Sequence, residues 1–140
     1  MTNYKDIFLY AILIIVLFTA SQHLNVVVSG SMEPVFYRGD IVIVEKTNFF
    51  GFHEFDPHDV KVGDIVVYNA VWHNSPVVHR IVNITEINGT TYYEIKGDNN
   101  QRSDPYYVSP EQIQDRVLTF NDQPLIIPNL GYITIILRGY

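Results

Sequence analysis

Cysteine is absent from the 140-residue sequence. Its absence excludes disulfide bonds, catalysis by a thiolate and cysteine-ligated metal sites, but it says little about the cellular compartment. Basic residues are also scarce, because nine Lys and Arg stand against 15 Asp and Glu, for a formal net charge of −6. A chain with this balance lacks the basic footprint of a nucleic-acid-binding protein. The length suits one modest domain, and the sequence contains no repeats or low-complexity tracts.

The most apolar stretch lies near the N-terminus, where IFLYAILIIVLFTA at residues 7–20 carries no charge. Continued as a helix to Val28, it would be about 33 Å long, enough to cross a hydrocarbon core of about 30 Å. A buried helix of a soluble protein is usually amphipathic, whereas this run is apolar on all sides. A cleavable signal peptide would have a basic start, but Lys5 is followed at once by Asp6. We predict a membrane anchor at residues 1–28, with the core helix and the signal peptide as alternatives.

The rest of the chain has the pattern of β-strands, because runs rich in Val, Ile, Tyr and Thr alternate with turn residues. The runs are residues 40–46, 63–70, 77–87, 91–97 and 116–120. Asn88-Gly89 is a strong signal for a two-residue hairpin, and SPEQ at residues 109–112 predicts one short helix. The sequence therefore predicts a mainly β fold, a small antiparallel barrel-like domain with one short helix, at residues 29–140.

A long connection between the first two predicted strands, TNFFGFHEFDPHDVKV at residues 47–62, is rich in phenylalanine. It either folds onto the core or dips into a membrane interface, where aromatic rings reside favourably. Four of its side chains could ligate a metal: His53, Glu54, Asp56 and His58. The zinc-protease motif needs two histidines one helical turn apart. Here the spacing differs and Pro57 disfavours a helix, so we predict no metal site.

Two serines flank a glycine in VVVSGSMEPVFYRGDIVIVEK, residues 26–46, where the apolar region meets charged residues. A serine hydroxyl is a poor nucleophile until a neighbouring base takes its proton. Of the five histidines, only His79 lies within a predicted strand, PVVHRIV. Such a histidine is more often structural, although histidine is well suited to general base catalysis. Asp98 and Asp104, in KGDNNQRSDPYY, could orient it or could simply form turns.

Four segments in this order, SGSMEPVFYRGDIVIVEK, GDIVVY, VVHRIV and YEIKGDNNQRSD, closely resemble type I signal peptidases. The resemblance runs from about Val26 to the end of the chain. In bacterial members the base is a lysine just before the arginine of the strand that matches VVHRIV. Here His79 holds that place, so the sequence resembles the archaeal and endoplasmic-reticulum branch, which uses serine, histidine and aspartate.

The resemblance implies a role for each of these residues. Ser31 would be the nucleophile, His79 the general base and Asp104 the acid that orients the histidine. Asp98 would support the shape of the site, although the sequence alone does not say which carboxylate reaches the imidazole.

Two neighbours of the predicted nucleophile also receive roles. Gly30 would let the backbone turn tightly and leave room for an extended peptide. The backbone N–H of Ser31 would bind the oxyanion, with the hydroxyl of Ser29 as a second donor. Ser29 could equally be a plain turn residue.

The expected function is that of a membrane-anchored serine endopeptidase that removes signal peptides from secreted preproteins after small residues, by acyl-enzyme chemistry. No cofactor is implied, because side chains and backbone amides suffice. The expected partners are signal-peptide-bearing preproteins and the lipid bilayer, with the secretion translocon left open and nucleic acid excluded. We expect a single-pass protein of the cell membrane with its catalytic domain on the extracytoplasmic face.

Two other functions compete. A non-catalytic, membrane-anchored β binding module would leave Ser31, His79 and Asp104 far apart. A self-cleaving repressor-type protease would need a lysine base and a DNA-binding region, and the sequence offers neither. The closing stretch PLIIPNLGYITIILRGY, residues 124–140, resembles the last strand of signal peptidases, many of which continue into a second membrane span. One anchor or a truncated sequence would both fit.

Overall fold

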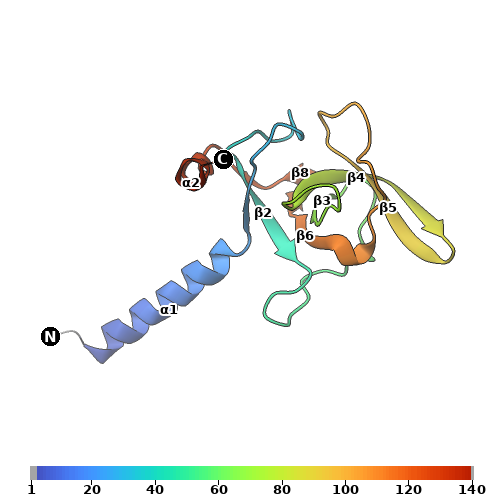
Figure 1. Ribbon diagram of the computed structural model, residues 1–140. Helices are drawn as coiled ribbons and strands as arrows, with labels where there is room; N and C mark the ends of the chain where they lie inside the picture. Colours follow the sequence, from blue (N-terminus) through green and yellow to red (C-terminus); the bar gives the residue numbers. More distant parts are fainter. Residues whose placement is uncertain (1–2, 140) are drawn as a thin grey trace.

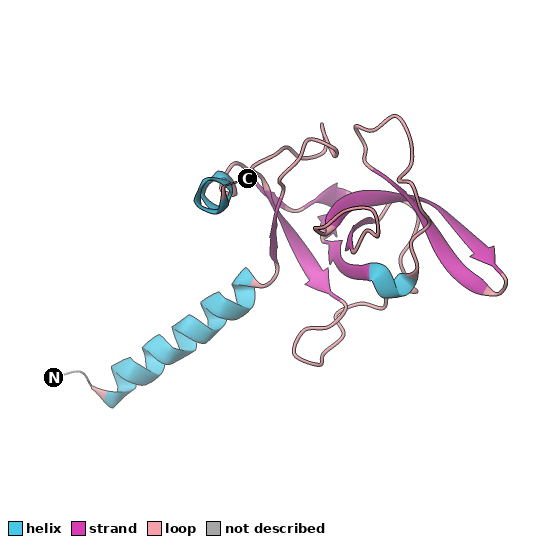
Figure 2. Ribbon diagram, viewed as in Figure 1, coloured by secondary structure: helices cyan, strands magenta, loops and turns pink. Residues whose placement is uncertain are grey.

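The computed structural model of the protein describes residues 3–139. An N-terminal helix projects from a β domain, and a short C-terminal helix lies on the side of the domain from which the first helix departs (Figures 1 and 2). The elements in chain order are α1 (Tyr4–Ser21), β1 (Leu24–Val26), β2 (Ile41–Lys46), β3 (Ile65–Tyr68), β4 (Val77–Ile87), β5 (Thr90–Lys96), the 3-10 helix η1 (Pro110–Gln112), β6 (Ile113–Val117), β7 (Thr119–Phe120), β8 (Gln123–Pro124), β9 (Ile126–Ile127) and α2 (Tyr132–Arg138).

The main sheet is antiparallel throughout, in the order β1-β2-β6-β3-β4-β5, with β9 also paired to β2. The β4–β5 hairpin turns at Asn88 and Gly89, whose φ angles of 52° and 77° are those of a primed two-residue turn. Within residues 3–139, β5 does not pair back to β1, so the sheet is not closed. The predicted mainly β, antiparallel fold is confirmed, and "barrel-like" describes it only loosely.

The central strand β3 is buried on both faces, and all four of its residues are inaccessible to solvent. Successive side chains of a strand point to opposite faces, so Val66 and Tyr68 enter one apolar cluster. Ile65 and Val67 enter a second cluster, which also contains Met32 from the segment after β1. A one-residue slip would move these side chains to the wrong faces, so this burial fixes the register of β4 and β6 against β3.

The helix α1 is 18 residues long, has a mean hydropathy of 1.7 and buries none of its residues. By length and composition it could cross a membrane. It begins after Asn3, whose side chain accepts a hydrogen bond from the backbone N–H of Lys5. A core helix of a soluble domain would be covered by the rest of the chain, so that alternative is wrong.

The boundary expected between anchor and domain at residue 28 needs correction. The helix ends at Ser21, and residues 24–26 form β1, in which Leu24 pairs with Ile43 of β2. Val27 is 5% exposed and belongs to the second core cluster. Strand pairing and core burial outweigh continuation of the helix, and the β-branched Val-Val-Val segment favours the extended conformation.

The C-terminal stretch also differs from expectation. Only β9 pairs with the sheet, and residues 132–138 form the helix α2 instead of a closing strand. The chain turns at Asn129, whose φ is 62°, and the N–H of Gly131 donates to the carbonyl of Gly39 at 2.8 Å. These contacts bring Ile135 into a buried position, 3% exposed. Tertiary packing thus overrides the β propensity of an isoleucine-rich segment.

The other predicted elements all occur. The run 116–120 is divided between β6 and β7, because the N–H of Leu118 donates to Ile43 at the break. The short helix is the 3-10 turn η1, in which the side-chain oxygen of Gln112 accepts from the N–H of Ser109 at 3.0 Å.

The loop after β2 is attached to the end of α1 through His23. The Nε2 atom of His23 lies 2.6 Å from Glu54 Oε1, and its Nδ1 atom lies 2.9 Å from the carbonyl oxygen of Thr19. Glu54 also accepts the backbone N–H of Lys46 at 2.7 Å. The imidazole packs edge-on against the ring of Phe49, with 4.6 Å between ring centroids. Both ring nitrogens face acceptors, which favours the doubly protonated form, and the hydrogen bond to Glu54 raises the pKa of His23.

Replacing Glu54 by Gln is expected to lower the pKa of His23 toward its ordinary value of 6.5. Because the pKa of His23 is raised in the folded state, its contact with Glu54 stabilises the fold fully below the ordinary pKa of about 6.5. This stabilisation is lost as the pH rises through the raised pKa. A partly exposed pair of this kind contributes about 0.5–1 kcal/mol. NMR titration of the imidazole in detergent micelles measures the shift. The variant Asp56→Asn is the control and should leave His23 unchanged; an unaltered pKa in Glu54→Gln would contradict the assignment.

Candidate active site

Ser31, His79 and Asp104 form a continuous chain of hydrogen bonds. His79 Nε2 lies 2.9 Å from Ser31 Oγ, and His79 Nδ1 lies 2.7 Å from Asp104 Oδ2. The side chains of His79 and Asp104 are each 4% exposed. An ionised carboxylate can only accept, so Nδ1 carries the proton and donates it to Asp104. This leaves the lone pair of Nε2 facing the hydroxyl of Ser31.

Ser31 stands in the turn that follows β1, and buried residues hold the turn in place. Met32 and Phe36 are each 1% exposed and pack into the second core cluster. The carbonyl of Ser31 accepts the backbone N–H of Asn99 at 2.8 Å, and the side-chain amide of Asn99 donates to the carbonyl of Gly30 at 3.0 Å. The loop after β5 therefore fixes the backbone on both sides of the Ser31 peptide.

His79 takes its position from the alternation of β4. It pairs with Val66 of β3 and shares a face of the sheet with Ile81, which belongs to the first core cluster. Asp104 comes from the loop after β5 and is held against that strand, since its backbone N–H donates to the carbonyl of Ile95 in β5 at 2.8 Å. Strand β4 and the loop after β5 thus bring the imidazole and the carboxylate together from positions 25 residues apart in the sequence.

Tyr68 is a further residue of the site, one that the sequence reasoning did not single out. Its hydroxyl donates to Asp104 Oδ2 at 2.6 Å, the same oxygen that accepts from His79, and the side chain is completely buried. Burial, together with the hydrogen bond to Asp104, raises the pKa of Tyr68, so it stays a neutral donor. The available sequence signal was a polar-tipped aromatic residue ending GDIVVY, a strand otherwise wholly apolar after its first two residues.

Asp98 does not reach the imidazole. Its two carboxylate oxygens accept from Arg80 Nε at 2.9 Å and Nη2 at 2.7 Å, and Arg80 Nη1 donates to the carbonyl of Gly63 at 2.8 Å. The hydrogen bond to Asp98 raises the pKa of Arg80. His79 and Arg80 are consecutive on β4 and point to opposite faces. The two aspartates that the sequence left undivided are separated by this alternation.

Gly97 lies where the Ser31 turn, the His79 side chain and the loop after β5 come closest to one another. A Cβ atom there would stand 2.7 Å from the carbonyl oxygen of Ser31 and 2.9 Å from His79 Nε2. The side-chain nitrogen of Asn100 would be 2.7 Å away. Only glycine fits this approach without displacing its neighbours. The sequence places Gly97 at the end of the predicted strand 91–97 and gives neither it nor Asn99 a role in the site, because close packing is invisible in a single sequence.

The remaining predicted residues lie beside the hydroxyl of Ser31. Ser29 Oγ is exposed and stands 3.2 Å from Ser31 Oγ. Among the hydrogen bonds of residues 3–139, none uses the backbone N–H of Ser31. The amide is therefore available to an incoming oxygen atom. The three atoms nearest to a Cβ atom on Gly30 would all belong to the flexible carboxylate of Glu33, the nearest at 2.8 Å.

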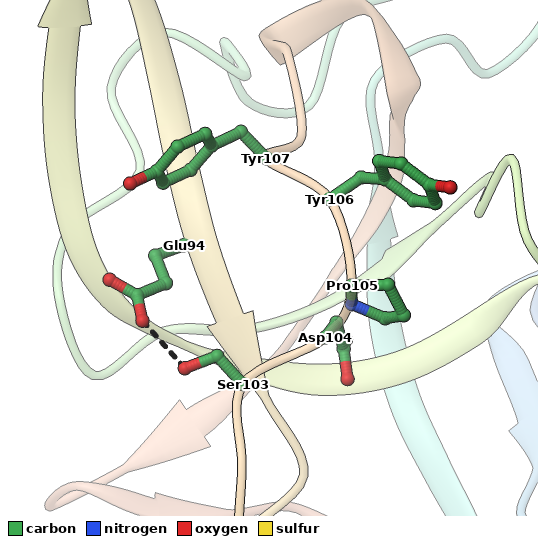
Figure 3. Close-up of a pocket in the computed structure, with 6 residues that line it drawn as sticks. All are labelled: Glu94, Ser103, Asp104, Pro105, Tyr106 and Tyr107. Carbon is green, nitrogen blue, oxygen red and sulfur yellow. Dashed lines mark hydrogen bonds between the residues drawn. The ribbon is translucent and has the colours of Figure 1, made fainter.

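A shallow pocket of about 260 Å³ borders Asp104. Its lining consists of Glu94, Ser103, Asp104, Pro105, Tyr106 and Tyr107. Figure 3 shows Ser103 donating to Glu94, at 2.6 Å, on the same side of the pocket as Tyr107, with Tyr106 apart from both. Neither Ser31 nor His79 lines this pocket, so it is not the place where the hydroxyl would meet a substrate.

A serine, a buried histidine and a buried aspartate linked in this order have the geometry of serine hydrolases, which recurs on unrelated folds. The comparison with known proteins narrows this class. Residues 1–85 match the family described as "Signal peptidase, peptidase S26". The chain belongs to the signal peptidase family. The matched residues include Ser31 and His79, whereas Asp98 and Asp104 lie beyond them.

Relatives support the predicted branch of the family. The chain is 35% identical to an uncharacterized protein of Methanocaldococcus jannaschii, and the match covers 90% of the chain and 89% of the relative. It is 37% identical to the signal peptidase complex catalytic subunit SEC11 of Colletotrichum graminicola, covering 82% of the chain and 63% of the relative. It is 34% identical to SEC11C of Homo sapiens, covering 91% and 63%. The chain thus spans less than two thirds of the SEC11 relatives. The predicted type I signal peptidase of the archaeal and endoplasmic-reticulum branch is confirmed, and with it the peptidase class.

The pair of Arg80 and Asp98 should be detectable as a coupling energy. We expect Arg80→Met and Asp98→Asn each to lower the free energy of unfolding. The loss in the double variant should be about 1–2 kcal/mol smaller than the sum of the two single losses. Chemical unfolding in detergent, followed by intrinsic fluorescence, measures each free energy. Asp98→Asn combined with Glu45→Gln, which removes a carboxylate that pairs with Arg116, is the control and should be additive. If the losses in Arg80→Met and Asp98→Asn simply add up in the double variant, the bidentate contact contributes nothing to stability.

Proposed function

We propose that the chain is a membrane-anchored serine endopeptidase that removes signal peptides from secreted preproteins. The observation that carries the proposal is the hydrogen-bonded chain of Ser31, His79 and Asp104 in a member of the signal peptidase family. The alternative of a non-catalytic binding module predicts that these residues lie far apart. The distances of 2.9 and 2.7 Å oppose that alternative.

The chemistry follows from the direction of the hydrogen bonds. Ser31 Oγ attacks the carbonyl carbon of the scissile peptide while His79 Nε2 takes its proton. Asp104 keeps the other nitrogen protonated and stabilises the imidazolium that forms. His79 then gives the proton to the leaving amine, which departs as the N-terminus of the mature protein. Water, activated by the same imidazole, hydrolyses the acyl-enzyme.

The oxyanion of the tetrahedral intermediate would bind two donors beside Ser31. One is the unpaired backbone N–H of Ser31, and the other is the hydroxyl of Ser29, which lies 3.2 Å from the nucleophilic oxygen. Losing one such donor typically costs about 2.7–4 kcal/mol of transition-state stabilisation. Side-chain selection would follow the family expectation of small residues at the first and third positions before the cut. Pockets of this kind exclude bulk well but distinguish single methylenes by only about 1–3 kcal/mol.

The helix α1 would hold the domain at the membrane surface. It is uncovered over its whole length and apolar enough to span, and β1 begins three residues after it ends. Tethering enzyme and substrate to one surface raises the effective concentration of the cleavage site. We place the catalytic domain, from residue 24 onward, on the extracytoplasmic face of the cell membrane. A preprotein emerging from the secretion translocon would meet it there.

Cleavage of a preprotein in detergent tests the proposal. Ser31→Ala and His79→Ala should each lower kcat/KM by about 10⁴-fold or more while the fold persists. Asp104→Asn should fall nearly as far, because its amide cannot hold the imidazole in the same tautomer, whereas Asp98→Asn should lose much less. His58→Ala, in the loop after β2, is the control. If Ser31→Ala cleaves as well as the wild type, the hydrolase proposal fails.

Gly97→Ala tests how closely the Ser31 turn and His79 must approach each other. The added methyl group would contact the Ser31 carbonyl and His79 Nε2 at 2.7 and 2.9 Å, so we expect the two catalytic groups to separate. A displacement of about 1 Å can cost about 10²-fold in rate. Gly89→Ala, at the hairpin turn where a Cβ atom meets nothing within 4 Å, is the control for backbone strain and should keep its activity. Full activity in a folded Gly97→Ala chain would contradict the geometry.

A further inference from the structure

The loop after β2 carries a tight turn with two bare phenylalanine rings. Phe49 and Phe52 pair through both backbone hydrogen bonds, at 2.8 and 2.9 Å. Phe50 and Gly51 occupy the turn with φ angles of 50° and 87°, and the side-chain oxygen of Asn48 accepts the N–H of Gly51 at 2.9 Å. Phe50 is 72% exposed and Phe52 74% exposed. The hydrogen bonds order this turn, so the exposure of the rings is built into the fold.

Exposure alone would mean little, because single apolar side chains are common on protein surfaces. Phe120 in the β7–β8 hairpin is 70% exposed and lies in a different part of the domain. The other phenylalanines of the loop after β2 are covered: Phe55 is buried at 7%, and Phe49 is half-buried against His23. The chain could therefore bury aromatic rings in this loop, and it leaves two of them outside.

The position of the turn distinguishes its two rings from Phe120. The His23 imidazole, two residues beyond the end of α1, contacts Phe49 and bonds to Glu54 on the far side of the turn. The turn is therefore fixed beside the point where α1 leaves the domain. Figure 1 shows the loop between β2 and β3 on the side of the sheet that α1 approaches. Aromatic rings at such a level favour the boundary between lipid headgroups and acyl chains.

We propose that Phe50 and Phe52 insert into the interface of the same bilayer that α1 spans, as a second membrane contact. This rests on the membrane anchoring in the proposed function. One helix leaves a domain free to tilt and rotate, whereas two contacts at different points hold it in one orientation. Ser31 is then held at a constant height above the membrane. The polar residues Thr47 and Asn48 flank the turn, so only its tip enters the lipid.

The absence of cysteine makes a direct test simple. Single variants Phe50→Cys, Leu13→Cys and Phe120→Cys of the full chain each receive one nitroxide label and are reconstituted in nanodiscs. Electron paramagnetic resonance compares collisions with oxygen, which concentrates in lipid, and with a water-soluble nickel complex. We expect oxygen to dominate for Phe50→Cys and for Leu13→Cys, in the middle of α1. The nickel complex should dominate for Phe120→Cys, the control of matched exposure.

The outcomes distinguish the proposed aromatic contact at Phe50 and Phe52 from the proposed membrane anchor α1. If the label in Phe50→Cys is reached by nickel as readily as that in Phe120→Cys, while Leu13→Cys is protected, the aromatic contact is overturned and the anchor stands. This is also the result expected if another protein, rather than lipid, covers the turn. If Leu13→Cys is not protected either, the anchor itself fails and both proposals fall.

A cleavage assay provides a second test of the aromatic contact with the membrane. The double variant Phe50→Ser with Phe52→Ser should cleave a preprotein inserted in vesicles about 3- to 10-fold more slowly than wild type. A short soluble peptide should be cleaved at the wild-type rate, since the turn does not touch Ser31, His79 or Asp104. Phe120→Ser should cleave both substrates normally. Equal losses on both substrates, or no loss on either, would overturn the proposal.

Discussion

The hydrogen bond between His79 and Asp104 joins two groups that are almost completely removed from water. Burying an imidazole and a carboxylate is costly unless each finds a partner. Here two further contacts hold Asp104: the Tyr68 hydroxyl donates to the same carboxylate oxygen, and the backbone N–H of Asp104 donates to the carbonyl of Ile95 in β5. With Nδ1 committed to Asp104, the free nitrogen of the ring is left for Ser31, and the chemistry of the site follows.

The contact between His79 and Asp104 depends in turn on the way successive side chains of β4 point to opposite faces of the sheet. β4 sends His79 into the side of the sheet where Tyr68 and Ile81 are buried, and it sends Arg80 to the other. The two acidic residues that follow β5 are divided accordingly, Asp104 to the imidazole and Asp98 to the guanidinium. Since β3 is buried on both faces, β4 cannot slip by one residue without exchanging these partners. Core packing therefore determines which aspartate contacts the imidazole.

In the proposed function, the connection to α1 would give the same domain a defined relation to the membrane. The β domain begins three residues after the helix ends, and His23 links the helix to the loop after β2. A short, hydrogen-bonded junction limits how far the domain can swing from the helix axis. The proposed cleavage of a substrate in the same bilayer would benefit from that restriction, because a freely swinging domain would seldom meet the scissile bond.

Local signals in the sequence determined much of this protein. The uncharged run of α1, the alternating apolar strands, the Asn88-Gly89 hairpin and the Ser-Gly-Ser segment before Met-Glu-Pro each depend on neighbours within a few residues, and their physical preferences are local. Residues 24–28 and 132–138 went against expectation, because strand pairing and burial of Val27 and Ile135 overrode local preference. The partners of Asp98 and Asp104, the hydroxyl of Tyr68 on the carboxylate and the close approach of Gly97 were decided only by the tertiary structure. Apart from the neighbouring Asn100, which also approaches Gly97, each is a contact between residues at least 18 positions apart in the chain, and a single sequence carries no measure of distance between them.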